Sequence, residues 1–133
     1  MSGRVAYLDS SAFVKLVVPE SESPALRRFL GRWPERTSSA LLRTEVARAL
    51  RRSGHDQDVG TARRLFGGLR LIRLDEVLLD RAGDLNPGAL RSLDAIHLAA
   101  ALAVGPDLGV FLTYDARLAA AATSEGLRVE SPA

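Results

Sequence analysis

The chain has 133 residues, of which 47% are hydrophobic, and its formal net charge is only +2. This length and composition predict a single domain over residues 1–133 with a packed core. The absence of cysteine excludes a disulfide scaffold, a thiol nucleophile and a thiolate-bound metal. The sequence has neither a membrane-spanning run nor a recognisable signal peptide, so we expect a cytoplasmic location and no membrane association.

Short apolar runs alternate with helical patterns along the whole chain. Strands are expected at residues 5–8, 36–39, 71–74, 110–114 and 127–130. Helices are expected at 11–18, 24–33, 40–53, 59–66, 76–85, 92–104 and 116–124, with Ser92 as a cap. Apolar strands that alternate with helices indicate an α/β fold, in which helices cover both faces of a central parallel sheet.

Four acidic residues occupy positions where an acid is unusual. Asp9 and Asp115 each end an apolar strand pattern, at 5–8 and 110–114. Asp94 precedes the uncharged stretch 95–104, and Glu45 borders the apolar stripe of the helix expected at 40–53. Parallel sheets bind ligands outside the carboxyl ends of their strands. The sequence therefore predicts that these acids share one site.

Each acid also has an ordinary structural interpretation. Asp9 and Asp115 suit the N-cap of the helix that follows each of them. Asp94 suits the first turn of its helix, where a negative charge favours the helix dipole. Glu45 can pair with Arg48 along the same helix. Taken one at a time, the acids are equally consistent with helix capping.

Convergence of the four acids would require a cation. Two carboxylates about 5 Å apart repel by roughly 3 kcal/mol at an effective dielectric constant near 20. Several such pairs are comparable to the total stability of a domain, about 5–15 kcal/mol. An all-oxygen ligand set selects Mg²⁺ or Mn²⁺ over zinc. Ser11 and Thr113 are expected to support the acids beside them, whereas His97 is expected to make a local hydrogen bond.

Arginine dominates the basic residues, with Lys15 as the sole lysine. This argues against phosphoacceptor domains, which use a lysine late in the chain. Arginine suits phosphate contacts, although solvated surface charges are also common. The candidates for contacts with a phosphate backbone are those close to the acids: Arg43, Arg48, Arg52, Arg91 and Arg117.

The segments that carry these acids resemble the PIN-domain ribonucleases, and within them the VapC-type toxins of bacterial type II toxin–antitoxin pairs. The resemblance covers essentially the whole chain, in the expected order. The matching segments are YLDSSA at 7–12, TEV at 44–46, LDAIHLA at 93–99, LTYD at 112–115 and GLRV at 126–129.

The resemblance implies a three-layer α/β/α sandwich with a central parallel sheet of about four or five strands. It also implies a metal-dependent endoribonuclease that cleaves transfer, ribosomal or messenger RNA and so inhibits translation. Asp9, Glu45, Asp94 and Asp115 would hold one or two Mg²⁺ or Mn²⁺ ions, assisted by Ser11 and Thr113. A cognate VapB-type antitoxin and a homodimer are the expected partners. The alternatives are a PIN nuclease in RNA processing and a binding module whose acids only cap helices.

Overall fold

The computed structural model describes residues 3–133. The strands are β1 (Val5–Leu8), β2 (Glu35–Ser39), β3 (Arg70–Ile72), β4 (Leu108–Leu112) and β5 (Val129–Glu130). The helices are α1 (Ser10–Val17), α2 (Ser23–Leu30), α3 (Leu42–Arg52), α4 (Val59–Phe66), α5 (Glu76–Asp84), α6 (Ser92–Val104) and α7 (Ala116–Ser124). Short 3₁₀ turns precede α4 and β4, at Asp56–Asp58 and Gly105–Asp107.

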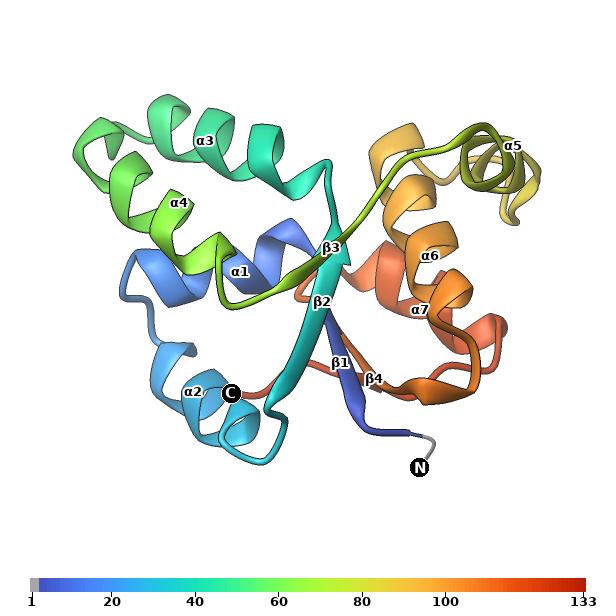
Figure 1. The fold of residues 1–133 in the computed structure, drawn as a ribbon, viewed down its shortest axis with the longest axis horizontal. Coiled ribbons are helices and arrows are strands. Elements are labelled where there is room, and N and C mark those ends of the chain that lie inside the picture. The colour runs from blue at the N-terminus through green and yellow to red at the C-terminus, as the bar shows by residue number, and fades with distance from the viewer. Residues whose placement is uncertain (1–2) are drawn as a thin grey trace.

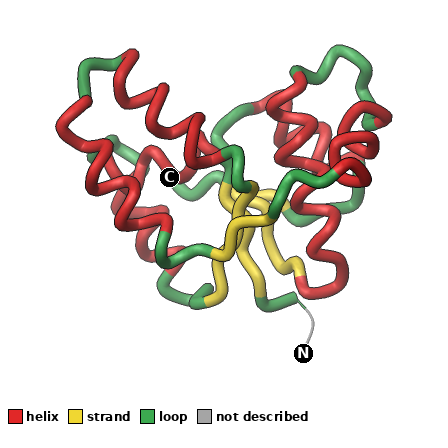
Figure 2. Tube along the Cα trace, turned by 45° about the horizontal axis from the view of Figure 1, so that its top comes forward, coloured by secondary structure: helices red, strands yellow, loops and turns green. Residues whose placement is uncertain are grey.

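The five strands form one parallel sheet in the order β3-β2-β1-β4-β5. In Figure 1 the helices α1 to α4 lie on one side of the sheet, and α5 to α7 lie on the other. Figure 2 shows the strands gathered between the two helical layers. The predicted three-layer α/β/α fold with a parallel sheet is confirmed.

Alternation along the strands explains why helices cover both faces. Tyr7 and Phe111 point to one face and pack with α5, α6 and α7 in one hydrophobic cluster. Ala6, Leu8 and Val110 point to the other face and pack against α1 and α2. A third cluster joins α1 to α3 and α4. Strands that are apolar on both faces belong in the middle of three layers.

Several element boundaries differ from the expected ones. Ser92 is the first residue of α6 and not its cap, because Arg91 takes the N-cap position without a capping side chain. The second helix ends at Leu30, and the turn that follows carries Trp33 to the side of the sheet, where it is partly buried. Such shifts at helix ends are common, since caps are set by tertiary contacts as well as by local sequence.

The sheet order creates a switch point between β1 and β4. From β1 the chain first adds β2 and β3 on one side, and it then returns to add β4 and β5 on the other. Loops that leave the carboxyl ends of β1 and β4 therefore run to opposite sides of the sheet and leave a crevice between them. No helix within residues 3–133 is both long and apolar enough to span a lipid bilayer.

Candidate active site

A pocket of about 350 Å³ lies at the carboxyl ends of β1 and β4, and all four predicted acids line it. We call it the acid pocket. Asp9 follows β1, Asp115 lies three residues after β4, and Glu45 and Asp94 stand in the first turns of α3 and α6. Its other lining residues are Ser10, Ser11, Arg52, Arg91, Ser92 and Leu93. Four segments that are distant in the sequence thus contribute one carboxylate each.

Asp9 is the most buried of the four, with 3% of its surface exposed. Its Oδ1 accepts hydrogen bonds from the Ser11 hydroxyl at 2.7 Å and from the Ala12 amide at 2.9 Å, which makes Asp9 the N-cap of α1. Its Oδ2 accepts a hydrogen bond from the Thr113 hydroxyl at 2.5 Å. These contacts fix the orientation of the carboxylate, and they involve both hydroxyl residues that the sequence had singled out.

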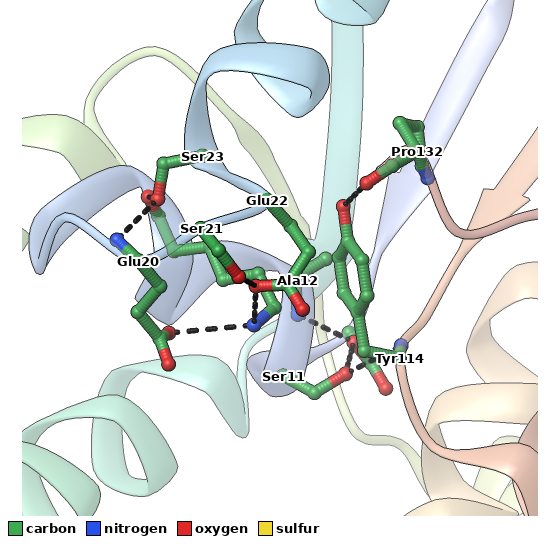
Figure 3. A network of polar contacts seen from close by, with 10 residues as sticks. Ser11, Ala12, Glu20, Ser21, Glu22, Ser23, Tyr114 and Pro132 are labelled. Carbon is green, nitrogen blue, oxygen red and sulfur yellow. Dashed lines mark hydrogen bonds and ion pairs between the residues drawn. The ribbon is translucent and has the colours of Figure 1, made fainter.

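Ser11 and Thr113 also hold the loop after β4. The Thr113 hydroxyl accepts a hydrogen bond from the Asp115 amide at 3.0 Å, and the Ser11 hydroxyl accepts one from the Tyr114 amide at 2.9 Å. Figure 3 shows Ser11 beside Tyr114, whose own hydroxyl donates to the carbonyl oxygen of Pro132 at 2.6 Å. The two hydroxyls therefore tie the loop that carries Asp115 to the loop that carries Asp9.

Arg91 joins Asp94 and Asp115. Its Nε lies 3.6 Å from Asp94 Oδ2, and its terminal nitrogen lies 3.4 Å from Asp115 Oδ2. The other oxygen of Asp115 caps α7 by accepting from the amides of Arg117 and Leu118. The guanidinium is mostly exposed, so this ion pair is weak and can be displaced.

Glu45 is held by a chain of buried polar groups. Its Oε1 lies 2.5 Å from Nε2 of His97, and Nδ1 of His97 lies 2.7 Å from the Tyr7 hydroxyl. His97 is 1% exposed and Tyr7 is fully buried. The expectation of a local hydrogen bond for His97 is wrong, because both partners lie far away in the sequence. The buried ring instead connects the acid pocket to the core beneath it.

Burial and mutual repulsion make two of the acids harder to ionise. Burial raises the pKa of Asp9, although the hydrogen bonds from Ser11, Thr113 and Ala12 oppose this effect. Burial also raises the pKa of Asp94, and the negative charges of Asp115 and Asp9 add to the rise while Arg91 opposes it. Groups that repel in this way favour a bound cation.

The donor chemistry of the acid pocket fits a hard divalent cation. Four carboxylates and neighbouring hydroxyls supply oxygen atoms only, as Mg²⁺ and Mn²⁺ prefer. Within residues 3–133, however, no three His, Cys, Asp or Glu side chains are arranged to hold a metal ion. The acids therefore share a pocket and a suitable ligand set without forming a ligand shell.

The candidate arginines separate into three groups. Arg52 and Arg91 line the acid pocket. Arg43 and Arg48 line a neighbouring groove between α3 and α4. Arg117 lines a different hollow, beside the turn at Asn86 and Pro87, and the acid pocket does not include it.

His97 and Tyr7 are site residues that the sequence had not indicated, although a histidine within an apolar helix predicts a buried ring with distant partners.

The comparisons with known proteins agree on the family that this chain resembles. Residues 6–124 match the PIN domain family. Ribonuclease VapC46 of Mycobacterium tuberculosis is 52% identical over 126 residues, which cover 95% of this chain and 96% of the relative. Ribonuclease VapC47 of the same species is 38% identical over 130 residues, again covering 95% of this chain and 96% of the relative.

Two solved structures share the fold at low sequence identity. Mycobacterium tuberculosis VapC20, described as a sarcin–ricin loop cleaving toxin, superposes with a TM-score of 0.73 at 18% identity, covering 87% of this chain and 94% of that one. VapBC2 from Rickettsia felis, bound to a DNA fragment from its promoter, superposes with a TM-score of 0.74 at 12% identity. The match covers 97% of this chain and 99% of that one. By its family match and its similarity to full-length relatives, the chain belongs to the PIN-domain family and, within it, to the VapC group.

Proposed function

We propose that this chain is a divalent-metal-dependent endoribonuclease that acts as the toxin of a toxin–antitoxin pair. One observation carries the proposal: carboxylates from four separate segments line one pocket at the switch point of a parallel sheet. The names of the VapC relatives as ribonucleases support RNA as the substrate. Cleavage of transfer, ribosomal or messenger RNA would stop translation.

Asp9, Glu45, Asp94 and Asp115 are the residues that would hold Mg²⁺, with Mn²⁺ as a substitute. When bound, such an ion activates a water molecule and neutralises charge on the phosphate. The hydrogen bonds from Ser11 and Thr113 keep the Asp9 carboxylate oriented toward the pocket. Either Asp94 or Asp115 accepts the proton of the attacking water. Arginines at the rim, including Arg52, contact the RNA backbone.

A VapB-type antitoxin is the proposed protein partner, and a homodimer is the proposed assembly. Support for the antitoxin comes from the VapBC2 structure of Rickettsia felis, in which one chain has the same fold. The homodimer is expected from the family resemblance. A small DNA-binding protein encoded beside this gene would be the natural candidate for the antitoxin. Co-purification of the two products, with loss of RNA cleavage on mixing, tests the partner. Sedimentation of the chain alone tests the homodimer.

The direct test of the activity compares RNA cleavage by the unaltered chain and by Asp9→Asn with Mg²⁺ present. We expect the variant to lose at least about 100-fold in rate, equivalent to about 2.7 kcal/mol of transition-state stabilisation. Asp80→Asn is the matched control, because Asp80 is exposed on α5 and lies outside the acid pocket. Equal cleavage by all three proteins would remove Asp9 from the mechanism.

A non-catalytic binding module is the second candidate, because Asp9 and Asp115 do cap α1 and α7. Such a module would show no RNA cleavage and no heat of Mg²⁺ binding that Asp9→Asn abolishes. A PIN nuclease that matures RNA outside a toxin system would cleave RNA without arresting growth on induction. Sequencing of RNA ends after induced expression, compared with the Asp9→Asn form, separates these outcomes and identifies the RNA.

A further inference from the structure

An arginine-lined groove of about 600 Å³ runs between α3 and α4, outside the acid pocket. We call it the arginine groove. Four of its lining residues are arginines and one is an acid: Arg43, Arg48, Arg51, Arg63 and Asp56. The remaining lining residues are small or apolar: Thr44, Ala47, Val59 and Gly60. The groove is therefore strongly positive, in a chain whose net charge is only +2.

The contacts within the groove leave two guanidinium groups available. Arg51 pairs with Asp56 at 3.6 Å, and the Arg43 guanidinium lies 5.5 Å from the centre of the Phe66 ring. Arg48 and Arg63 are exposed, and among residues 3–133 no carboxylate lies within ion-pair distance of either. Exposed guanidinium groups that no acid neutralises are suited to bidentate contacts with phosphate.

Arg48 connects the arginine groove to the acid pocket. Arg48 lines the groove, and Arg52, one helical turn further along α3, lines the acid pocket. Residues four apart on a helix are neighbours on its surface. Glu45 lies one turn before Arg48, so the same side of α3 carries an acid of the pocket and the basic residues that lead away from it.

We propose that the arginine groove binds the sugar–phosphate backbone of the RNA strand whose phosphodiester bond enters the acid pocket. The inference rests on the proposed nuclease function and names the path that the strand takes away from the site. An RNA strand that is cut internally must continue beyond the acid pocket. Arg52 and Arg48, which are adjacent on the surface of α3, direct the strand on one side of the cleaved bond into the arginine groove. There Arg63 on α4 contacts a further phosphate.

The experiment measures binding of a fluorescent single-stranded RNA to the full chain in EDTA, over a range of salt concentrations. The double variant Arg48→Gln/Arg63→Gln removes the two available guanidinium groups. We expect affinity to fall about tenfold, and the slope of log affinity against log salt to fall by about 1.4, because each phosphate contact on a single strand contributes about 0.7. Arg48→Lys/Arg63→Lys keeps both charges and is expected to retain most of that slope.

The matched control is Arg27→Gln/Arg28→Gln, which removes the same charge from exposed positions on α2. It is expected to change affinity less than about twofold, because distant surface charges are screened by salt. Equal losses in both double variants would overturn the proposal in favour of general attraction. Unaltered affinity and slope in the groove variant, or no RNA binding by the unaltered chain, would overturn it as well.

Cleavage of the same RNA with Mn²⁺, measured in parallel, separates this inference from the proposed function. If the unaltered chain binds RNA through the arginine groove but does not cleave it, the result contradicts the proposed nuclease function and supports RNA binding by the groove. If the chain cleaves RNA and the groove variant binds it with unaltered affinity and slope, the groove alone fails.

Discussion

The hydroxyl of Tyr7 and the ring of His97 lie in the core, yet they determine how Glu45 meets the acid pocket. Both ring nitrogens of His97 have partners, one of them Tyr7 and the other Glu45. Burial raises the pKa of Tyr7 well above its ordinary value, so the hydroxyl stays protonated. A fully paired buried histidine cannot rotate without losing a hydrogen bond. Glu45 is therefore held in one orientation from beneath.

Removal of the Tyr7 hydroxyl should destabilise the fold. Tyr7→Phe keeps the ring stacked on Phe111 but leaves Nδ1 of His97 buried without a partner. An unsatisfied buried polar group costs about 1–3 kcal/mol, and we expect urea unfolding to report a loss in that range. The control is Tyr114→Phe, which removes a hydroxyl from a partly buried position and should cost about 1 kcal/mol or less. Equal costs would contradict this role for His97.

The corner between α1 and α2 shows how one lysine can hold two elements together. The ammonium of Lys15 donates to Glu22 at 3.1 Å and to Glu20 at 3.5 Å, and it lies 4.6 Å from the centre of the Tyr114 ring. Figure 3 shows Glu20, Glu22 and Tyr114 around this corner. Burial, together with the charges of Glu22 and Asp9, raises the pKa of Tyr114 to about 12. The corner thus packs against the loop that leads to Asp115.

Stability of this corner should depend on pH through Glu22. The hydrogen bond from Lys15 lowers the pKa of this carboxyl in the folded chain. Its contribution is therefore complete above the ordinary glutamate pKa, near 4.3, and is lost as pH falls through the lowered value. We expect Glu22→Gln to have a lower melting temperature than the unaltered chain at pH 7. The difference between the two melting temperatures should disappear in acid. A difference that widens in acid would contradict the assignment.

β4 requires a glycine at position 109. A Cβ built there would overlap the ring of Trp33 and the carbonyl oxygen of Gly3. We expect Gly109→Ala to lower the unfolding free energy by about 1–3 kcal/mol, as overpacking does. Gly83→Ala is the control, because that glycine lies within α5 with open space around it, and alanine favours a helix by about 1 kcal/mol. A neutral effect at Gly109 would show that Trp33 can move aside.

At the scale of the whole molecule, the sequence predicted the layers and the positions of the acids because both follow from local patterns. Apolar strands alternating with helices indicate a parallel sheet. Asp9 directly follows β1, and Asp115 lies three residues after the end of β4. The partners of His97 could not be predicted, since they lie 90 and 52 residues away and depend on how α6 packs against β1 and α3. The arginine groove likewise exists only once α4 packs beside α3.

Around the acid pocket, too, only the charge pairs that are close in the sequence could be predicted from it. The sequence showed that Arg91 precedes Asp94 by one helical turn, but it gave no indication that Arg91 also reaches Asp115 from a different loop. A guanidinium shared by two carboxylates offsets part of their repulsion. A divalent ion in the acid pocket would offset more of it, and the proposed activity depends on that ion.

The proposed activity requires that the four carboxylates bind a divalent cation together, and calorimetric titration with Mn²⁺ measures this binding. We predict that the unaltered chain binds Mn²⁺ with measurable heat, and that Asp94→Asn weakens the affinity at least about tenfold, or about 1.4 kcal/mol. Asp80→Asn, outside the acid pocket, should bind Mn²⁺ as the unaltered chain does. An unaltered chain without Mn²⁺ binding, or an Asp94→Asn variant that binds it equally well, would contradict the account.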